Sequence, residues 1–250
     1  MKTTTFIVLM LLIATLSSAQ SDTVSQQSTK SRNVKLDVFA GYTMAFGKYI
    51  NTDRDDGQSG YAANGFFIQV SGSWLGKRGL GLGLSYCFQN NAIAAPDTIP
   101  AGHYEPLGSK HWSNHYLLAG PVFSREFGKW LLTLKFQGGG VLSFSPAFRI
   151  WMPSSDSLNI NDTRLSDGPG FGVAMQALAG IGYRVTNNLS VNLAFSYLGG
   201  NPVRMKSYSQ YIYETDPATG VQTPVFVKGE IERKKKISTF NIGLGLVFKL

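Results

Sequence analysis

The most constraining feature of this sequence is the stretch 239–250, which alternates strictly between two kinds of residue. Every second residue is apolar, and those between are mostly small or polar. The apolar set is Phe240, Ile242, Leu244, Leu246, Phe248 and Leu250. A period of two is that of a β-strand, whose successive side chains point to opposite faces. One face of the expected sheet must therefore meet a broad apolar surrounding.

The same alternation recurs in seven earlier segments, so we expect eight strands in all. The seven segments span about 34–47, 63–75, 80–90, 113–125, 130–144, 173–185 and 189–197. In the fourth, Leu117 and Leu118 blur the two faces, and Pro121 predicts a β-bulge because proline lacks a backbone donor. Beyond residue 33, no apolar run reaches the roughly 18 residues of a membrane helix. Any membrane crossing would therefore require a closed sheet.

The connections between these strands alternate in length. Short turns are expected at 76–79, 126–129 and 186–188, and long connections at 48–62, 91–112, 145–169 and after residue 197. In the last connection, strand-like segments at 203–213 and 223–236 flank the turn sequence 216–220, which predicts a protruding hairpin. An even number of strands with alternating short and long connections is typical of outer-membrane barrels. We therefore predict an all-β fold: an eight-stranded antiparallel up-and-down transmembrane β-barrel over 34–250, with long extracellular loops and short periplasmic turns. The first and last strands are expected to pair.

Aromatic residues support this prediction. Trp74, Phe127, Trp130 and Tyr183 lie beside short turns, and Tyr42, Phe46, Trp112, Phe144 and Tyr197 lie near long connections. Two such girdles are expected where a barrel meets the two membrane surfaces. A soluble lipocalin-like barrel, with its apolar face inside, remains the alternative.

The N-terminus has the features of an export signal. Lys2 precedes the apolar run 6–16, and Ser17 and Ala19 supply the small residues of a cleavage site. We interpret 1–19 as a cleaved signal peptide and the polar segment 20–33 as a flexible periplasmic leader. The expected location is the cell outer membrane.

Polar residues on the other strand faces would line the barrel lumen. They are Lys35, Asp37, Gln69, Lys135, Gln137, Gln176, Arg184, Asn192, Asn241 and Lys249. They could form a selective pore or a packed polar plug in which Asp37 pairs with a basic neighbour. The interior of an eight-stranded barrel is only wide enough for side chains to fill, which favours the plug.

The last long connection is strongly basic. It carries Arg204, Lys206, Lys228, Arg233, Lys234, Lys235 and Lys236, in a chain of net charge +8. These residues could contact lipopolysaccharide phosphates or an acidic ligand, or form a solvated strand pair that resists aggregation. We expect outer-membrane lipid and lipopolysaccharide as partners, rather than nucleic acid, and a monomeric chain.

Other candidate sites are weaker. His111 and Ser113 share a strand face and are similar to the His-x-Ser of outer-membrane lipid A deacylases, but no well-placed acid accompanies them. His103, His111 and His115 lack metal-ligand spacing, and Asp53, Asp55, Asp56 and Gly57 lack the later Glu of a calcium loop. Cys87 is the single cysteine. We therefore expect no enzyme activity, cofactor or metal, with a lipid-modifying enzyme and a narrow channel as alternatives.

Three short segments carry a family resemblance. They are Ser18-Ala19-Gln20, Val38-Phe39-Ala40-Gly41-Tyr42 and Gly243-Leu244-Gly245-Leu246-Val247-Phe248. With them, the chain resembles the small outer-membrane β-barrel family common in Bacteroidota, related in architecture to the OmpA and OmpX transmembrane domains. The resemblance implies insertion by the barrel-assembly machinery and a structural or surface-interaction role, and transfers no catalytic residue. In such a barrel, a charge at Leu244 is expected to block assembly, and one at Gly243 to be tolerated.

Overall fold

A computed structural model describes residues 33–51, 60–94, 104–107, 111–153, 159–165, 169–200, 203–205, 208–228 and 233–250. The expected signal peptide, almost all of the expected leader and the aspartates of the first long connection lie outside these ranges. Within them, no helix has the length and apolar character needed to cross a membrane.

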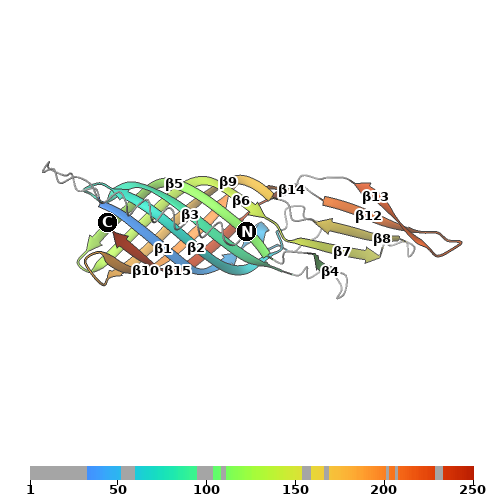
Figure 1. The fold of residues 1–250 in the computed structure, drawn as a ribbon, viewed down its shortest axis with the longest axis horizontal. Coiled ribbons are helices and arrows are strands. Elements are labelled where there is room, and N and C mark those ends of the chain that lie inside the picture. The colour runs from blue at the N-terminus through green and yellow to red at the C-terminus, as the bar shows by residue number, and fades with distance from the viewer. Residues whose placement is uncertain are drawn as a thin grey trace, which may run out of the picture. The chain divides into compact units, whose positions relative to one another are not determined.

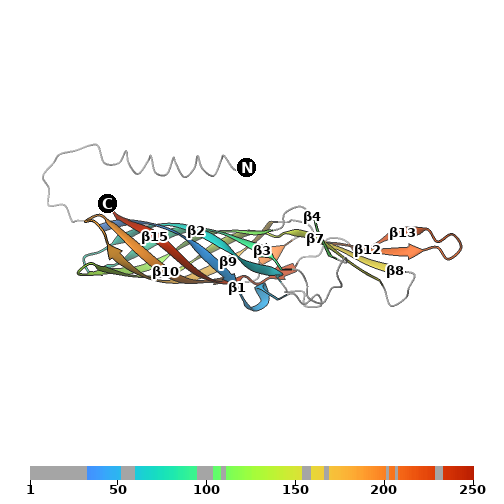
Figure 2. The same ribbon diagram turned by 90° about the horizontal axis from the view of Figure 1, so that it is seen from below.

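Eight long antiparallel strands close into a barrel (Figure 1). They are β1 (Asn33–Ala45), β2 (Ala62–Leu75), β3 (Leu80–Ile93), β5 (His111–Phe127), β6 (Trp130–Phe144), β9 (Pro169–Arg184), β10 (Leu189–Gly200) and β15 (Ser238–Lys249). Each pairs with its successor, and β15 pairs with both β10 and β1 (Figure 2). The closing seam runs from Lys35 opposite Lys249 to Ala45 opposite Thr239. The predicted fold and its closing pair are confirmed.

The two faces of the barrel wall follow the alternation of the sequence. In β3, Leu82 and Leu84 are exposed on the outer surface, whereas Ser85, Cys87 and Gln89 are fully buried in the lumen. The other barrel strands show the same division. The apolar face is therefore outside, which excludes the inverted, lipocalin-like arrangement.

The fourth barrel strand keeps its alternation. Leu117 is exposed and Leu118 is buried, so the two leucines occupy opposite faces. The β5–β6 register is the same on both sides of Pro121, with Ala119 opposite Gly138 and Val122 opposite Lys135. The predicted bulge at Pro121 is wrong: the missing donor interrupts the ladder locally without inserting a residue. A register shift occurs instead in β2, between Ala62 and Gly65.

The barrel has two different ends. At the short-turn end, β2 joins β3, β5 joins β6 and β9 joins β10 through the predicted turns. Gly79 (φ 78°) and Gly128 (φ 63°) adopt left-handed conformations there, which glycine accepts without steric cost. At the opposite, long-connection end, the 3₁₀ helix η1 (Gly47–Tyr49) follows β1. Short strands β11 (Val203–Met205) and β14 (Arg233–Lys235) pair with each other there, and β11 also pairs with β9.

The long connections form a second, five-stranded sheet. Its order is β13 (Gln222–Lys228), β12 (Tyr208–Thr215), β8 (Asn159–Leu165), β7 (Ala147–Pro153) and β4 (Tyr104–Leu107) (Figure 1). The predicted hairpin exists as β12 and β13, joined around 216–220. However, β12 also pairs with β8, and β7 pairs with both β8 and β4. The second and third connections, expected to be loops, therefore contribute strands.

The two expected aromatic rows lie on the outer surface, with one exception. Trp74, Phe127, Trp130 and Tyr183 are exposed near the short turns, as are Tyr42, Phe46 and Tyr197 near the other end, where Phe144 is half-buried. Trp112 was expected to join the second row, but its side chain is buried. It occupies a lumen position of β5, in step with Asn114 and Tyr116, so that part of the prediction is wrong.

Candidate functional site

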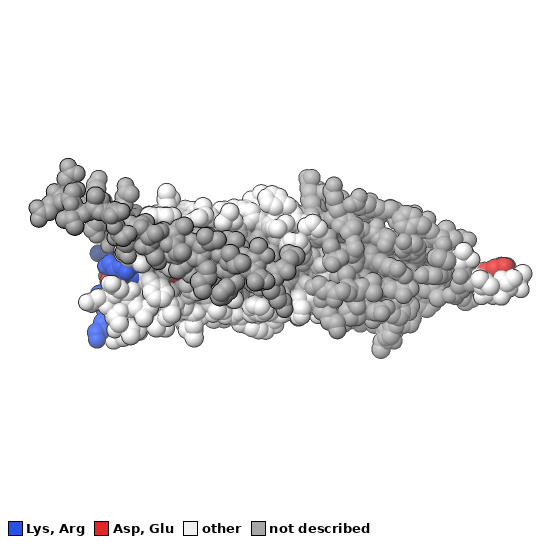
Figure 3. All heavy atoms as spheres, viewed as in Figure 1, with Lys and Arg blue, Asp and Glu red and all other residues white. Residues whose placement is uncertain are grey.

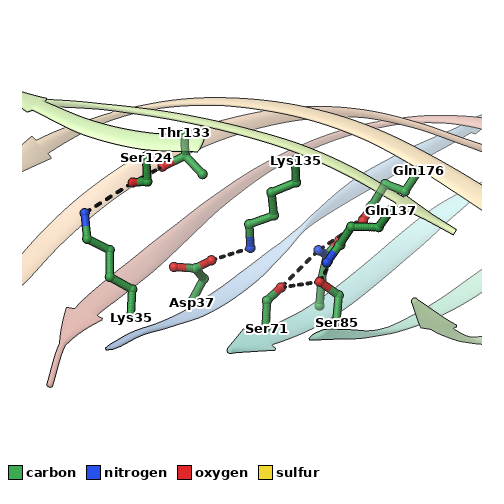
Figure 4. A network of polar contacts seen from close by, with 10 residues as sticks. Lys35, Asp37, Ser71, Ser85, Ser124, Thr133, Lys135, Gln137 and Gln176 are labelled. Atoms are coloured by element: carbon green, nitrogen blue, oxygen red, sulfur yellow. Dashed lines mark hydrogen bonds and ion pairs between the residues drawn. The ribbon is translucent and has the colours of Figure 1, made fainter. Parts of the chain in front are cut away.

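The lumen near the short-turn end contains a buried ion pair. Nζ of Lys135 donates to Oδ2 of Asp37, and both side chains are almost completely buried (Figure 4). Beside it, Nζ of Lys35 donates to Oγ of Ser124 at 3.2 Å, and that oxygen lies 3.2 Å from Oγ1 of Thr133. The buried carboxylate therefore has a cationic partner, as a charge inside a barrel wall requires.

A layer of amides and hydroxyls crosses the middle of the lumen. Gln69 and Gln176 exchange hydrogen bonds, at 2.8 and 3.3 Å. Oγ of Ser85 lies 2.6 Å from Oε1 of Gln137 and 3.0 Å from Oγ of Ser71. These contacts join β2 and β3 to β6 and β9 across the barrel (Figure 4). Such cross-barrel bonds are those of a filled interior.

A third layer lies closer to the long-connection end. Nε2 of Gln89 donates to Oδ1 of Asn241 at 2.9 Å and to Oγ1 of Thr239 at 3.0 Å. The hydroxyl of Tyr116 donates to Oε1 of Gln89 at 3.1 Å, so both ends of this amide are bonded. Asn192, in contrast, is buried with neither side-chain atom hydrogen-bonded within the described part of the chain.

Two buried aromatic side chains, Tyr49 and Trp112, pack together at the long-connection end of the lumen, and we call them the aromatic cap. Tyr49, from η1, is fully buried, and its hydroxyl accepts a 2.9 Å hydrogen bond from Nδ2 of Asn114. Burial raises the pKa of the Tyr49 hydroxyl far above its ordinary value. Trp112 meets Tyr49 edge to face at 5.4 Å and donates from Nε1 to the carbonyl oxygen of Gly60 at 2.9 Å. The sequence analysis did not identify Tyr49 as a lumen residue, because it lies beyond the alternating segment of the first strand. The available signal was the presence of an aromatic residue just after a strand.

At the short-turn end, one carboxylate attracts three cations. Glu126 lies 3.2 Å from Arg184 and 3.7 Å from both Lys35 and Lys249. The side chains of Arg184 and Lys249 are more than one-third exposed. These two members of the predicted lumen set therefore lie at the mouth of the barrel, and the remaining eight lie deeper, at buried positions.

Ser113, one member of the candidate hydrolase pair, contacts a histidine that the sequence analysis did not pair with it. Ser113 lies near His115: its Oγ is 3.5 Å from Nε2, while Nδ1 of the same imidazole is 2.8 Å from the hydroxyl of Tyr86. Phe88 and Phe144 flank the imidazole at 5.1 and 5.9 Å. All of these side chains lie on the outer surface of the barrel. The group that orients the His115 imidazole is therefore the phenol of Tyr86, where a hydrolase triad would have a carboxylate.

The metal hypotheses concern few described residues. His103 and the first-loop residues Asp53, Asp55, Asp56 and Gly57 lie outside the described ranges. Within those ranges, no group of three His, Cys, Asp or Glu side chains is placed to hold a metal ion.

The basic residues of the last connection are described in part. Lys206 lies outside the described ranges, and only Lys235 and Lys236 have described side chains. Lys236 is exposed, whereas Lys235 is buried with its Nζ 5.8 Å from the centre of the Tyr61 ring. The strand register places Arg204 opposite both Lys234 and Phe171, and the Phe171 side chain is 69% exposed on the outer surface.

Comparisons with known proteins give distant structural likenesses only. No family model and no curated protein sequence matches the chain. It is similar to Neisserial surface protein A, at 13% identity and a TM-score of 0.43, with 87% of this chain and 97% of that one covered. A major outer membrane protein of Thermus thermophilus gives 11% identity, a TM-score of 0.45 and coverages of 88% and 100%. Ail of Yersinia pestis gives 10% identity, a TM-score of 0.40 and coverages of 87% and 99%. At these scores the likenesses carry no argument about function, and the barrel is defined by the chain's own strand pairings.

Proposed function

We propose that this chain is an exported, monomeric, integral protein of the Gram-negative outer membrane. In this proposal it is a small barrel of the Bacteroidota type, with OmpA- and OmpX-like architecture, inserted by the barrel-assembly machinery. The observation that carries the proposal is the apolar outer wall, where large side chains such as Leu82 and Leu244 are 66% and 64% exposed. About ten residues at roughly 3.3 Å each, tilted near 40°, cover the ~25 Å apolar band of such a barrel.

The barrel in this proposal is an anchor rather than a channel. The buried Asp37–Lys135 pair, the amide-and-hydroxyl layers around Gln69 and Gln89, and the Tyr49 cap fill its interior at four levels. The biological role then belongs to the surface formed by the long connections, through structural support or contact with a partner.

A test of membrane insertion uses Leu244 and a matched exposed residue outside the barrel. Leu244→Lys places a charge within the apolar band, at a cost of about 2–4 kcal/mol near its centre, and should abolish accumulation in the outer-membrane fraction. Val221→Lys, in the β12–β13 connection, should leave it unchanged. Heat-modifiable gel migration of the detergent-extracted protein reports the folded barrel. A mature chain that stays soluble without detergent would contradict the proposal.

The basic residues of the last connection are the proposed contact for lipopolysaccharide phosphates. The register supports this for Arg204 and Lys234, because two cationic positions lie directly opposite each other and level with the exposed Phe171. Two cationic residues at paired strand positions suit a phosphate, which accepts charge-assisted hydrogen bonds from both Arg and Lys. Lys235 is the least suited member of the group, since it is buried.

This contact can be tested by lipopolysaccharide retention. Arg204→Gln with Lys234→Gln should reduce the lipopolysaccharide retained during purification, with about 1 kcal/mol lost per cation. Arg204→Lys with Lys234→Arg keeps the charge and should retain it. Equal retention by the neutral and the charged pairs would count against the contact.

A further inference from the structure

The short-turn end of the barrel is strongly basic. Figure 3 shows Lys and Arg atoms, in blue, gathered at the end of the barrel where the short turns lie. Seven basic residues lie there: Lys35, Lys77, Arg78, Arg125, Lys129, Arg184 and Lys249. The described strand ends and turns at this end of the barrel contribute one side-chain carboxylate, that of Glu126.

The carboxylate of Glu126 forms its ion pairs with cations at the mouth of the barrel. Its three cationic partners are Lys35, Arg184 and Lys249, at 3.2–3.7 Å. Of the other four cations, Lys77, Arg78 and Lys129 lie on the turns β2–β3 and β5–β6, and Arg125 lies near the end of β5. All four are exposed, and none has a carboxylate partner among the described residues. We call these four residues, Lys77, Arg78, Arg125 and Lys129, the basic rim. The rim therefore presents positive charge that the described part of the chain does not neutralise.

Two cations of the basic rim are held against the aromatic row. The guanidinium of Arg125 lies 5.4 Å from the Phe127 ring centre, and Nζ of Lys129 lies 5.9 Å from that of Tyr183. Trp130 packs edge to face on Tyr183 at 5.5 Å. These rings are exposed on the outer barrel surface, and exposed aromatic rows mark the boundary between the apolar band and the headgroups. The two cations are thus placed at headgroup height.

We propose that the basic rim binds the phosphate groups of anionic glycerophospholipids in the leaflet that surrounds the short turns. This inference rests on the proposed membrane placement and adds a lipid preference to it. Phosphates are the anions present at headgroup height, and Lys and Arg bind them through charge-assisted hydrogen bonds. A soluble acidic macromolecule fits less well, because Arg125 and Lys129 are held against rings that face the membrane.

Tryptophan quenching provides a direct measurement, because Trp74 and Trp130 are exposed next to the basic rim. The full mature chain is folded into phosphatidylcholine vesicles containing a minority of phosphatidylglycerol, with one or the other lipid brominated. The expected result is stronger quenching, per brominated molecule, by phosphatidylglycerol than by phosphatidylcholine. High salt should remove the difference, since exposed charges are screened.

Two variants make the test specific. Replacing all four rim residues with Gln should abolish the preference, because each cation near an anionic surface contributes roughly fivefold. The charge-retaining set Lys77→Arg, Arg78→Lys, Arg125→Lys and Lys129→Arg should keep it. Equal quenching by both lipids, or a preference that survives neutralisation, would overturn the inference.

Two further outcomes separate the possible failures. If neither brominated lipid quenches any variant and the protein shows no heat-modifiable migration, the proposed membrane placement fails as well. If quenching is equal but soluble polyglutamate binds the protein in a salt-dependent way that needs the four cations, the rim recognises a soluble acidic partner, and the lipid inference is wrong.

Discussion

Asp37 of β1 and Lys135 of β6 form a buried ion pair across the lumen, between strands far apart in the sequence. The pair links one of the two seam strands to the opposite wall. It is one of the polar contacts that fill the interior of the barrel.

Removing one member of this pair should destabilise the barrel. Asp37→Asn leaves Lys135 buried without its counter-charge, which costs about 3–5 kcal/mol for a buried pair. Asp37→Asn combined with Lys135→Met should cost less than the single change, because no unpaired charge remains. Urea unfolding in detergent micelles, followed by tryptophan fluorescence, would measure both. A double variant less stable than the single one would contradict the ion-pair explanation.

The sequence analysis expected a charged residue at Gly243 to be tolerated, but the structure leaves no room there even for a methyl group. A Cβ there would lie 2.6 Å from Cζ of Phe67 and 2.8 Å from the carbonyl oxygen of Ala40. Gly243→Ala should therefore lower stability by about 1–3 kcal/mol through overpacking. Gly72→Ala is the matched control, since a Cβ at Gly72 meets nothing within 4 Å. Similar unfolding midpoints for the two variants would refute this crowding at the seam.

The Tyr49 cap should contribute to stability through both its ring and its hydroxyl. Tyr49→Phe removes the hydrogen bond from Asn114 and should cost about 1–3 kcal/mol. Tyr49→Ala also leaves a cavity beside Trp112, for a total near 3–5 kcal/mol. Because the deeper layers remain, both variants should stay silent in planar-bilayer recordings. Steady single-channel currents from Tyr49→Ala would show that the cap alone closes the lumen.

The outer-surface Ser113–His115 contact should not support ester hydrolysis. The imidazole of His115 is oriented by the neutral phenol of Tyr86, which offers no negative charge to stabilise an imidazolium. Cells expressing wild-type protein or Ser113→Ala should therefore carry lipid A with identical acylation, as judged by mass spectrometry. A loss of acyl chains that depends on Ser113 would show the enzyme alternative to be correct.

The turn of the β12–β13 hairpin should respond to acid. Thr219 Oγ1 and the Ala218 amide donate to the Asp216 carboxylate at 2.7 and 2.9 Å, and these bonds lower the pKa of that carboxyl. Its contribution to the turn is complete above the ordinary value of about 3.9 and is lost as pH falls through the lower folded value. In a pH titration followed by NMR, the Ala218 amide resonance should thus shift with a midpoint below about 3.9. Asp216→Asn should remove this titration. A midpoint above that value would contradict the assignment.

The sequence alone predicted the barrel wall well because the strand period is a local property. From the alternation in 239–250 and seven other segments, the number of barrel strands, the faces of all but the fourth strand and the β1–β15 closure could be derived. Eight of the ten residues predicted to line the lumen are buried for the same reason: once a strand's face is fixed, every second residue follows.

Other features depend on which residues meet across the lumen or between distant connections. Periodicity shows that Gly243 faces inward, but only the tertiary structure brings the Phe67 ring against it. Likewise, Asp37 could have paired with several cations, and the stagger of the barrel strands places Lys135 opposite it.

Contacts between distant connections could not be predicted either. The second sheet was missed because its short strands pair between different connections, for example β12 with β8. Trp112 lies inside because β5 begins earlier than the alternation indicated, and Gly60, from another connection, accepts its indole hydrogen bond.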